Sequence, residues 1–350
     1  MIIKEINLEN FRNHKQRVIE FLPGITAIVG PNASGKTNLL ESLFLLALGT
    51  SSRTQVGSEM IAHGQSLARV NCQVIDQEKM TLEVVLTTGE INQARVAKKR
   101  YLINGIAKRK MDFVGCLKAV YFGPQDLELI LGSPSIRRNY LNSILEQVDR
   151  DYRRASLSYQ KGLRQRNKLL EQIREEGKPR SMLFFWDKLL IENGQLMTQK
   201  REELIESINQ SPYFKPVEVF YDKSVISIDR LKQYERQEVA AAATLVGPHR
   251  DDFQIFLNGK NQKRSLHSYG SRGEQRLAVF ALKLAELDFI TTRTETKPIL
   301  LLDDIFSELD HQHRKQLFKI IPKHQTIITT SDIYLIEPEF RKKLTLVKFL

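Results

Sequence analysis

Hydrophobic and polar positions in the first 120 residues follow the short alternating or fully apolar runs that are typical of β-strands. Gly89 and the pair Asn104-Gly105 mark turns among these runs. Between the early and the later strands the apolar spacing changes to that of a helix at Asn38–Leu48. The expected strands are Ile2–Leu8, Arg17–Phe21, Ile25–Val29, Ala68–Ile75, Thr81–Thr87 and Tyr101–Ile103.

Residues 135–210 have a different pattern, polar and helical in period. Gly177-Lys178-Pro179 divides this region into two helical stretches. Apolar residues share one face of each stretch, as expected for two helices that pack on a neighbour. These residues are Leu163, Leu170 and Ile173 in the first stretch, and Leu196, Leu204 and Ile208 in the second.

The last third of the chain returns to β-prone runs, at Val217–Phe220 and Val225–Ile228. A helix is expected at Gly273–Ile290, followed by strands at Ile299–Leu302 and Thr326–Thr330. Alternating strands and helices predict an α/β fold. We therefore expect a discontinuous α/β head made of residues 1–120 and 247–350, with a mainly helical arm, residues 121–246, inserted between its halves.

The strongest chemical signal is the run Gly30-Pro31-Asn32-Ala33-Ser34-Gly35-Lys36-Thr37, which fits the phosphate-binding pattern G-x-x-x-x-G-K-[ST]. An apolar strand precedes this run and a helix follows it, as such a loop requires. Its backbone amides and the helix N-terminus can surround phosphate oxygens. We assign nucleotide contacts to the whole run and to Asn38, with Lys36 on the β- and γ-phosphates and Thr37 on Mg²⁺.

A second apolar run, Ile299–Leu302, ends in Asp303-Asp304. A buried parallel strand delivers its last residues to the carboxyl edge of the sheet, where ligands bind. Asp303 is then expected to hold Mg²⁺, and Asp304 to polarise an attacking water. Lys36 and Asp304 are accordingly the candidate catalytic residues.

Two further motifs, Ser271-Arg272-Gly273-Glu274-Gln275-Arg276 and Ser307-Glu308-Leu309-Asp310, resemble the signature and D-loop of ABC-type ATPases. In that class the signature serine and glycine, here Ser271 and Gly273, bind the γ-phosphate held by the opposite subunit. A simpler interpretation stays open beside this one. Ser271 also fits a helix N-cap, with Glu274 as its capping-box partner.

Composition and charge narrow the classes of partner and the cellular location. The 350 residues include 53 basic and 41 acidic ones, a formal net charge of +12, which suggests an anionic partner such as nucleic acid, membrane surface or nucleotide. Two cysteines do not make a secreted disulfide scaffold. No apolar run is long enough for a transmembrane helix, and the N-terminus lacks the pattern of a secretory signal. We expect a cytoplasmic protein with no membrane partner.

The basic surplus is concentrated in the predicted head, because residues 121–246 contain 20 basic and 18 acidic residues. Within Ile91–Lys110 there are seven basic residues and no acid. A second basic stretch spans Arg150–Lys168, with Asp151 as its one acid. Either stretch could bind DNA phosphates without reading sequence, and either could be a solvated surface. We assign DNA binding to Lys98, Lys99, Arg100, Lys108, Arg109 and Lys110.

Several motifs together resemble the RecF family, bacterial recombination mediators related to SMC proteins. The resemblance covers nearly the whole chain, and its most diagnostic piece is Gly247-Pro248-His249-Arg250-Asp251-Asp252, which general ABC ATPases lack. No mechanism for this string follows from the sequence. The other pieces are Leu8–His14, Gly30–Thr37, Gly123–Leu127, Gly132–Pro134 with Arg137-Arg138, Ser271–Arg276 with Ala281–Glu286, and Leu300–Asp310.

The resemblance implies an ABC/SMC-type ATPase head that binds ATP and Mg²⁺ and forms an ATP-dependent homodimer with composite sites. It implies DNA binding, a weak DNA-stimulated ATPase used as a switch, and cooperation with RecR and RecO in loading RecA at single-strand gaps. It also suggests nucleotide contacts for Arg12 and Asn13, and Gln125 as a Q-loop metal ligand.

Three other classes of nucleotide-binding protein fit the sequence less well. A transporter ATPase subunit would need a switch histidine, but Thr326–Thr330 leads into Ser331-Asp332. A chromosome-structuring SMC protein would need much longer coiled-coil arms than the insert provides. A nucleotide kinase or small GTPase would need neither the signature nor the D-loop.

Overall fold

The computed structural model describes residues 1–54, 56–91, 93–258, 263–308 and 311–349. The chain forms two compact units. Unit 1 contains residues 1–126 and 290–350, and unit 2 contains residues 127–289. Unit 1 is thus discontinuous, as expected, but residues 247–289 pack with the inserted segment. The functional division into a head and an arm stays a prediction.

Among the described residues, unit 1 contains a six-stranded antiparallel sheet whose strands alternate between one buried and one more exposed face. Its order is β2 (His14–Glu20), β1 (Ile2–Phe11), β4 (Leu67–Ile75), β5 (Lys79–Thr87), β8 (Lys99–Ile103) and β9 (Ile106–Lys108). A small separate ribbon pairs β6 (Glu90–Ile91) with β7 (Ala94–Arg95).

The described part of unit 1 also has a five-stranded parallel sheet, and this sheet positions the candidate site. Its three central strands are almost entirely buried because both of their faces are covered. The order is β10 (Ala119–Phe122), β14 (Ile299–Asp303), β15 (Thr326–Thr330), β3 (Ile25–Val29) and β16 (Leu344–Lys348). Apart from α1 (Lys36–Leu48), the helices in the described part of unit 1 include α2 (Lys110–Phe113), which contacts β8, α11 (Ile305–Glu308), α12 (His311–Ile320) and α13 (Pro338–Arg341).

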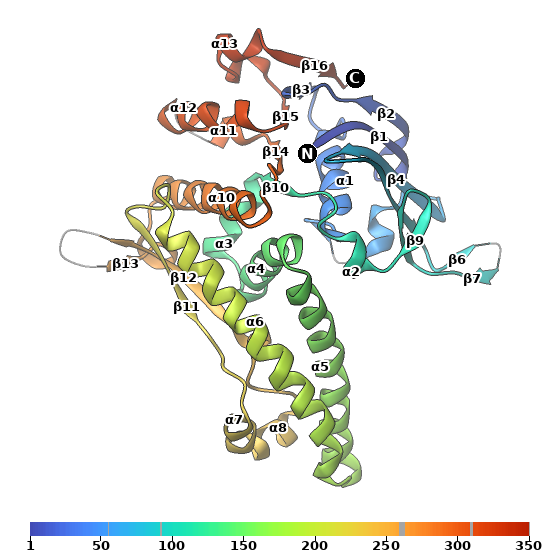
Figure 1. The fold of residues 1–350 in the computed structure, drawn as a ribbon, viewed down its shortest axis with the longest axis vertical. Coiled ribbons are helices and arrows are strands. Elements are labelled where there is room, and N and C mark those ends of the chain that lie inside the picture. The colour runs from blue at the N-terminus through green and yellow to red at the C-terminus, as the bar shows by residue number, and fades with distance from the viewer. Residues whose placement is uncertain (55, 92, 259–262, 309–310, 350) are drawn as a thin grey trace. The chain divides into compact units, whose positions relative to one another are not determined.

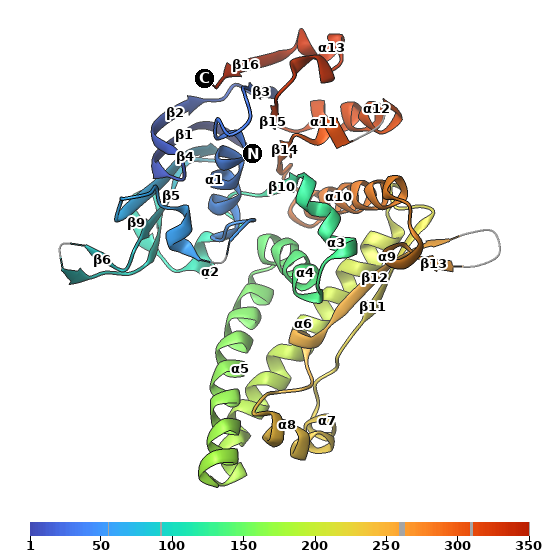
Figure 2. The same cartoon turned by 180° about the vertical axis from the view of Figure 1, so that it is seen from behind.

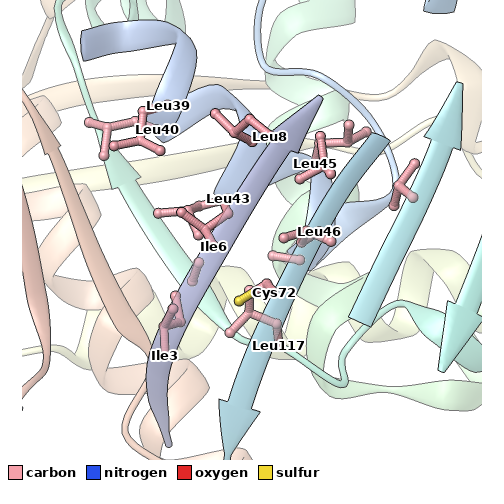
Figure 3. Close-up of a cluster of buried hydrophobic side chains, with 14 of the residues drawn as sticks. Ile3, Ile6, Leu8, Leu39, Leu40, Leu43, Leu45, Leu46, Cys72 and Leu117 are labelled. Atoms are coloured by element: carbon pink, nitrogen blue, oxygen red, sulfur yellow. The ribbon is translucent and has the colours of Figure 1, made fainter. Parts of the chain in front are cut away.

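Helix α1 (Lys36–Leu48) lies in the core of unit 1. Most of its residues are buried, so it packs on several sides rather than along one stripe. Figure 3 shows its leucines facing β1 and β4 around Ile6 and Cys72. The P-loop helix is therefore fixed by a large apolar core.

Unit 2 is built on two long helices, α5 (Arg150–Glu176) and α6 (Phe184–Gln210), which lie side by side in Figures 1 and 2. The helices are separated by a break at Gly177, as predicted. Of the apolar residues predicted to share a face, Leu163 and Leu196 are only half-buried, and four are buried: Leu170, Ile173, Leu204 and Ile208. A three-stranded sheet contains β11 (Val217–Asp222), β12 (Asp252–Asn258) and β13 (Lys263–Ser265). The other helices are α3 (Glu128–Leu131), α4 (Pro134–Val148), α7 (Ile228–Gln233), α8 (Glu235–Ala241), α9 (Leu266–Tyr269) and α10 (Arg272–Thr294), which continues into unit 1.

Most predicted strands and long helices are confirmed, but the strand expected at Val225–Ile228 is wrong. This segment is extended without a strand partner in the described structure and then begins α7. Ser227 caps that helix by accepting a hydrogen bond from the backbone N–H of Arg230. Local capping therefore outweighs the β propensity of the segment.

Within the described residues, none of the helices combines the length and apolar character that a membrane span requires.

Candidate functional site

The loop Gly30–Thr37 connects β3 to α1. Ala33 and Gly35 both have left-handed backbone conformations, with φ of 65° and 95°. Such alternation turns successive amides toward one point and forms an anion-binding nest. Lys36 Nζ donates to the carbonyl oxygens of Gly30 and Pro31, both at 2.8 Å, so its ammonium lies against the loop. The local geometry is that of a phosphate-binding loop.

Asp303 joins the P-loop to the other strands of the parallel sheet. Its Oδ1 accepts hydrogen bonds from Thr37 Oγ1 at 3.0 Å and from Thr329 Oγ1 at 2.6 Å. Its Oδ2 accepts from the Tyr121 hydroxyl at 2.8 Å. Burial, and then the charge of Asp303, raises the pKa of Tyr121, so this phenol stays protonated and donates. The predicted meeting of Thr37 and Asp303 is present.

Sequence reasoning did not identify Tyr121 or Thr329. Both hydroxyl groups lie near the carboxyl ends of strands in the same sheet as Asp303. Their position near the ends of apolar runs was the available signal. The order of the strands in the sheet was also needed to show that both hydroxyl groups lie beside Asp303.

Asp304 follows Asp303 with a left-handed backbone, φ 50°, and its backbone N–H donates to the Thr329 carbonyl oxygen at 3.1 Å. A non-glycine residue in this region often belongs to a functional site. This turn places Asp304 at the carboxyl edge of the sheet, beside the residue expected to hold the metal.

The turn between β1 and β2 lies against the P-loop. Asn13 Nδ2 donates to the Ala33 carbonyl at 3.3 Å, and its Oδ1 accepts from Asn38 at 2.8 Å. His14 Nε2 lies 3.1 Å from the Gly35 carbonyl, to which it can only donate. Burial lowers the pKa of His14, which favours the neutral ring.

Arg12 is engaged within this chain. Its Nε and Nη2 donate to the two oxygens of Glu41, at 3.0 and 2.7 Å, and the Glu41 side chain is fully buried. The bidentate pair links the turn to the middle of α1. Arg12 thus has a structural role in addition to the nucleotide contact that was predicted for it.

The capping interpretation of Ser271 is confirmed. Its Oγ accepts from the Glu274 backbone N–H at 3.3 Å, and its own backbone N–H donates to Glu274 Oε2 at 2.9 Å. The Ser271 N–H hydrogen bond lowers the pKa of Glu274. Ser271 and Gly273 are exposed at the start of α10, and space is open around the Gly273 Cα.

Two other predicted elements have less support. Gln125 is exposed in the 3₁₀ turn Pro124–Leu127, and no contact in the described structure connects it to Asp303. In the D-loop, residues 309 and 310 lie outside the described residues.

The Gly247–Asp252 string braces unit 2. His249 contacts the Tyr159 hydroxyl at 2.8 Å and the Thr244 carbonyl at 2.9 Å. Burial lowers the pKa of His249 to about 4, so the ring is neutral at pH 7. Asp251 is fully buried and accepts from Arg201 at 2.6 Å. These contacts join α5 and α6 to the segment that precedes β12 and give the string a structural function.

The basic residues of Ile91–Lys110 do not form one uniform surface. Lys98, Arg100 and Lys108 are exposed, whereas Lys99 is half-buried. Arg109 pairs with Asp112 at 2.9 Å, and Lys110 is half-buried at the start of α2.

In the second basic stretch, Arg166 is buried and pairs with Asp187 and Glu238. That arginine therefore belongs to the interior of unit 2, which weakens the second stretch as a DNA surface.

The residues present fit both a nucleotide and a magnesium ion. Ser34 Oγ is buried and has no hydrogen-bond partner within the described part of the chain, which suits a hydroxyl that donates to a phosphate oxygen. The hydroxyl of Thr37 and the carboxylate of Asp303 are hard oxygen ligands of the kind that Mg²⁺ prefers. These two side chains would hold the ion.

Residues 2–344 match the family model described as the RecF/RecN/SMC N-terminal domain. The DNA replication and repair protein RecF of Herpetosiphon aurantiacus is 36% identical over 377 aligned positions, which cover 99% of this chain and 97% of that protein. The RecF protein of Bacillus thuringiensis is 34% identical, with 98% and 95% covered. The chain belongs to the RecF family.

Solved structures agree with this assignment. The recombination mediator RecF with ATPrS, described as part of the RecFOR pathway, matches with a TM-score of 0.84 and 32% identity, over 96% of this chain and 94% of that one. An Smc head bound to a ScpA domain, with a TM-score of 0.53 and 17% identity, shares the fold. The predicted ABC/SMC-type ATPase head fold is thereby confirmed, and the inserted arm remains a prediction.

Proposed function

We propose that this RecF-family protein is an ATP-switched DNA-binding recombination mediator. ATP with Mg²⁺ binds at the P-loop and brings two copies together, the dimer holds DNA, and slow, DNA-stimulated hydrolysis releases it. RecR and RecO are the expected partners in loading RecA at single-strand gaps or stalled forks. The single observation that carries the proposal is the convergence of Thr37, Tyr121 and Thr329 on Asp303 beside the P-loop.

Each residue has a defined task in this proposal. The P-loop amides and Lys36 bind the phosphates, and Thr37 with Asp303 holds the metal, which neutralises phosphate charge when bound. Asp304 orients the attacking water. The start of α10, where Ser271 and Gly273 are exposed, would face the γ-phosphate of a second copy with the partial positive charge of a helix N-terminus.

The nucleotide part is tested first with Lys36→Ala, using the exposed Lys15→Ala as the matched control. We expect Lys36→Ala to abolish ATP binding measured by calorimetry, and Lys15→Ala to leave it unchanged. An unaltered affinity in Lys36→Ala would contradict the site. Asp304→Asn is expected to bind ATP and to accumulate as a dimer, measured by light scattering.

The composite site is tested by mixing two inactive variants. Lys36→Ala lacks a working P-loop, and Ser271→Arg blocks the signature while leaving nucleotide binding intact. A mixed dimer contains one site with an unmodified P-loop and an unmodified signature. We therefore expect partial ATPase activity on mixing, and continued inactivity would argue against sites shared between copies.

DNA binding is tested with gapped, duplex and single-stranded probes, with and without ATP. Reversing the exposed charges of Lys98 and Arg100 is expected to weaken binding and to reduce its salt dependence. Unchanged binding would place the DNA surface elsewhere.

A further inference from the structure

The P-loop helix α1 ends against the basic strand β8. Gly49, directly after the helix, is left-handed with φ 66°, and its N–H donates to the Leu45 carbonyl. The Gly49 carbonyl oxygen accepts from Lys99 Nζ at 3.1 Å and from the Tyr101 hydroxyl at 3.0 Å. Two side chains of one strand therefore hold the last turn of the helix that begins at the P-loop.

Successive side chains of strand β8 point to opposite faces of the sheet. Lys99 and Tyr101 pair with Leu86 and Val84, which are fully buried and face the core. Arg100 lies between them, so its side chain points to the opposite side of the sheet, where it is exposed. The same strand contacts α1 on one face and carries a DNA-binding candidate on the other.

The contact between the Lys99 ammonium group and the Gly49 carbonyl oxygen is both close and charged. A helix C-terminus carries partial negative charge, which a cation stabilises. Burial, and then the neighbouring Lys110, lowers the pKa of Lys99 to about 8. A Cβ added at Gly49 would lie 3.0 Å from the Tyr101 ring and 3.2 Å from Lys110 Cε. With so little free space, a shift of β8 is transmitted to the end of α1.

We propose that Lys99 and Tyr101 are positioning residues that couple DNA held by Arg100, on the exposed face of β8, to nucleotide held at the opposite end of α1. This inference rests on the proposed function and adds the route by which the two ligands affect each other. Coupling between two binding sites is reciprocal: the factor by which ATP changes DNA affinity equals the factor by which DNA changes ATP affinity.

The experiment measures both factors. DNA affinity is measured by fluorescence anisotropy of a labelled gapped duplex, with and without a slowly hydrolysed ATP analogue. Affinity for the analogue is measured by calorimetry, with and without the same duplex. The variants are Lys99→Met, which keeps the aliphatic stem, and Tyr101→Phe, which removes one hydroxyl. Lys98→Met is the matched control, because that exposed neighbour also loses one charge.

We expect each of the variants Lys99→Met and Tyr101→Phe to weaken the coupling. Within one variant, the effect of the analogue on DNA affinity and the effect of DNA on affinity for the analogue should fall by the same factor. For Lys99→Met the loss should be about 2- to 30-fold, the range for a cation at a helix C-terminus. Lys98→Met should weaken DNA binding alike with and without the analogue and so keep the coupling. The inference is overturned if Lys99→Met weakens DNA binding but keeps the coupling factor, as Lys98→Met should. It is also overturned if neither Lys99→Met nor Tyr101→Phe changes the coupling factor. A wild-type protein that binds the analogue but no DNA would instead refute the proposed function.

Discussion

The ion pair between Arg12 and Glu41 offers a test of what Arg12 does. Glu41 has no exposed side-chain area and the Arg12 side chain is 19% exposed, so the pair is largely shielded from water. Removing one partner of a fully buried pair costs about 3–5 kcal/mol, since a buried charge is left without its counterion. When Arg12 is removed, Glu41 keeps one nearby cation, because Arg53 Nη1 lies 3.8 Å from Glu41 Oε2. Replacing both partners with apolar residues of similar size costs far less.

We therefore expect Arg12→Met and Glu41→Met each to lower the free energy of unfolding of unit 1 by about 3 kcal/mol, the lower end of that range, because Arg12 can still reach water and Arg53 stays close to Glu41. The double variant should lose clearly less than the sum of the two single losses. Methionine keeps the length of both side chains. It is also unbranched at Cβ, which suits the left-handed backbone of Arg12, φ 55°.

Urea unfolding measures these losses, and the transition of unit 1 is identified as the one that ATP shifts to higher urea. The affinity for ATP is measured in parallel. Strictly additive losses below about 1 kcal/mol, together with a large fall in ATP affinity for Arg12→Met alone, would refute the structural role and favour direct nucleotide contact.

Three further outcomes are expected. Gly247→Ala should lower the melting temperature of unit 2 strongly in a thermal scan, because φ is +126° and the new Cβ would lie 2.2 Å from the Tyr159 hydroxyl. Because burial depresses the pKa of His249 from 6.5 to about 4, the unfolded chain binds more protons between these values. Stability should fall as the pH drops through that window, and His249→Gln should flatten the fall in urea titrations. Tyr121→Phe removes a hydrogen bond to the carboxylate of Asp303 and should cost about 1.5–3 kcal/mol in urea unfolding, with weaker magnesium-dependent ATP binding by calorimetry.

Much of unit 1 could be predicted from local pattern. The run Ile25–Val29 is apolar on both faces, and the glycines and Lys36 after it specify a phosphate loop without any tertiary information. Asp303 was predictable for the same reason, since it ends an apolar strand. In unit 2 the helical period of α5 and α6 predicted two long helices, although not the residues that hold them together.

Other features depended on contacts between distant residues. The buried pair of Arg201 and Asp251 joins positions 50 apart in sequence, and neither residue has a local pattern that indicates burial. Lys99 was assigned to DNA through its neighbours in sequence, yet strand alternation turns it toward Gly49. Charge density identifies a basic segment, but only the pairing register separates its outward charges from its inward ones.

The order of the parallel strands explains why a threonine of β15, Thr329, belongs to the nucleotide site. Strand β15 lies between β14 and β3, so the strand that ends in Asp303 and the strand that leads to the P-loop are not neighbours. Thr329 of β15 fills the intervening position and donates to the same carboxylate oxygen as Thr37. The spacing between the P-loop and Asp303 is therefore set by a third strand. Thr329→Val, which keeps the shape but removes the donor, should loosen that spacing and weaken magnesium-dependent ATP binding in calorimetry, whereas Thr329→Ser should retain it. Retained binding in Thr329→Val together with a loss in Thr329→Ser would show that packing of the methyl group, rather than the hydrogen bond, maintains the spacing.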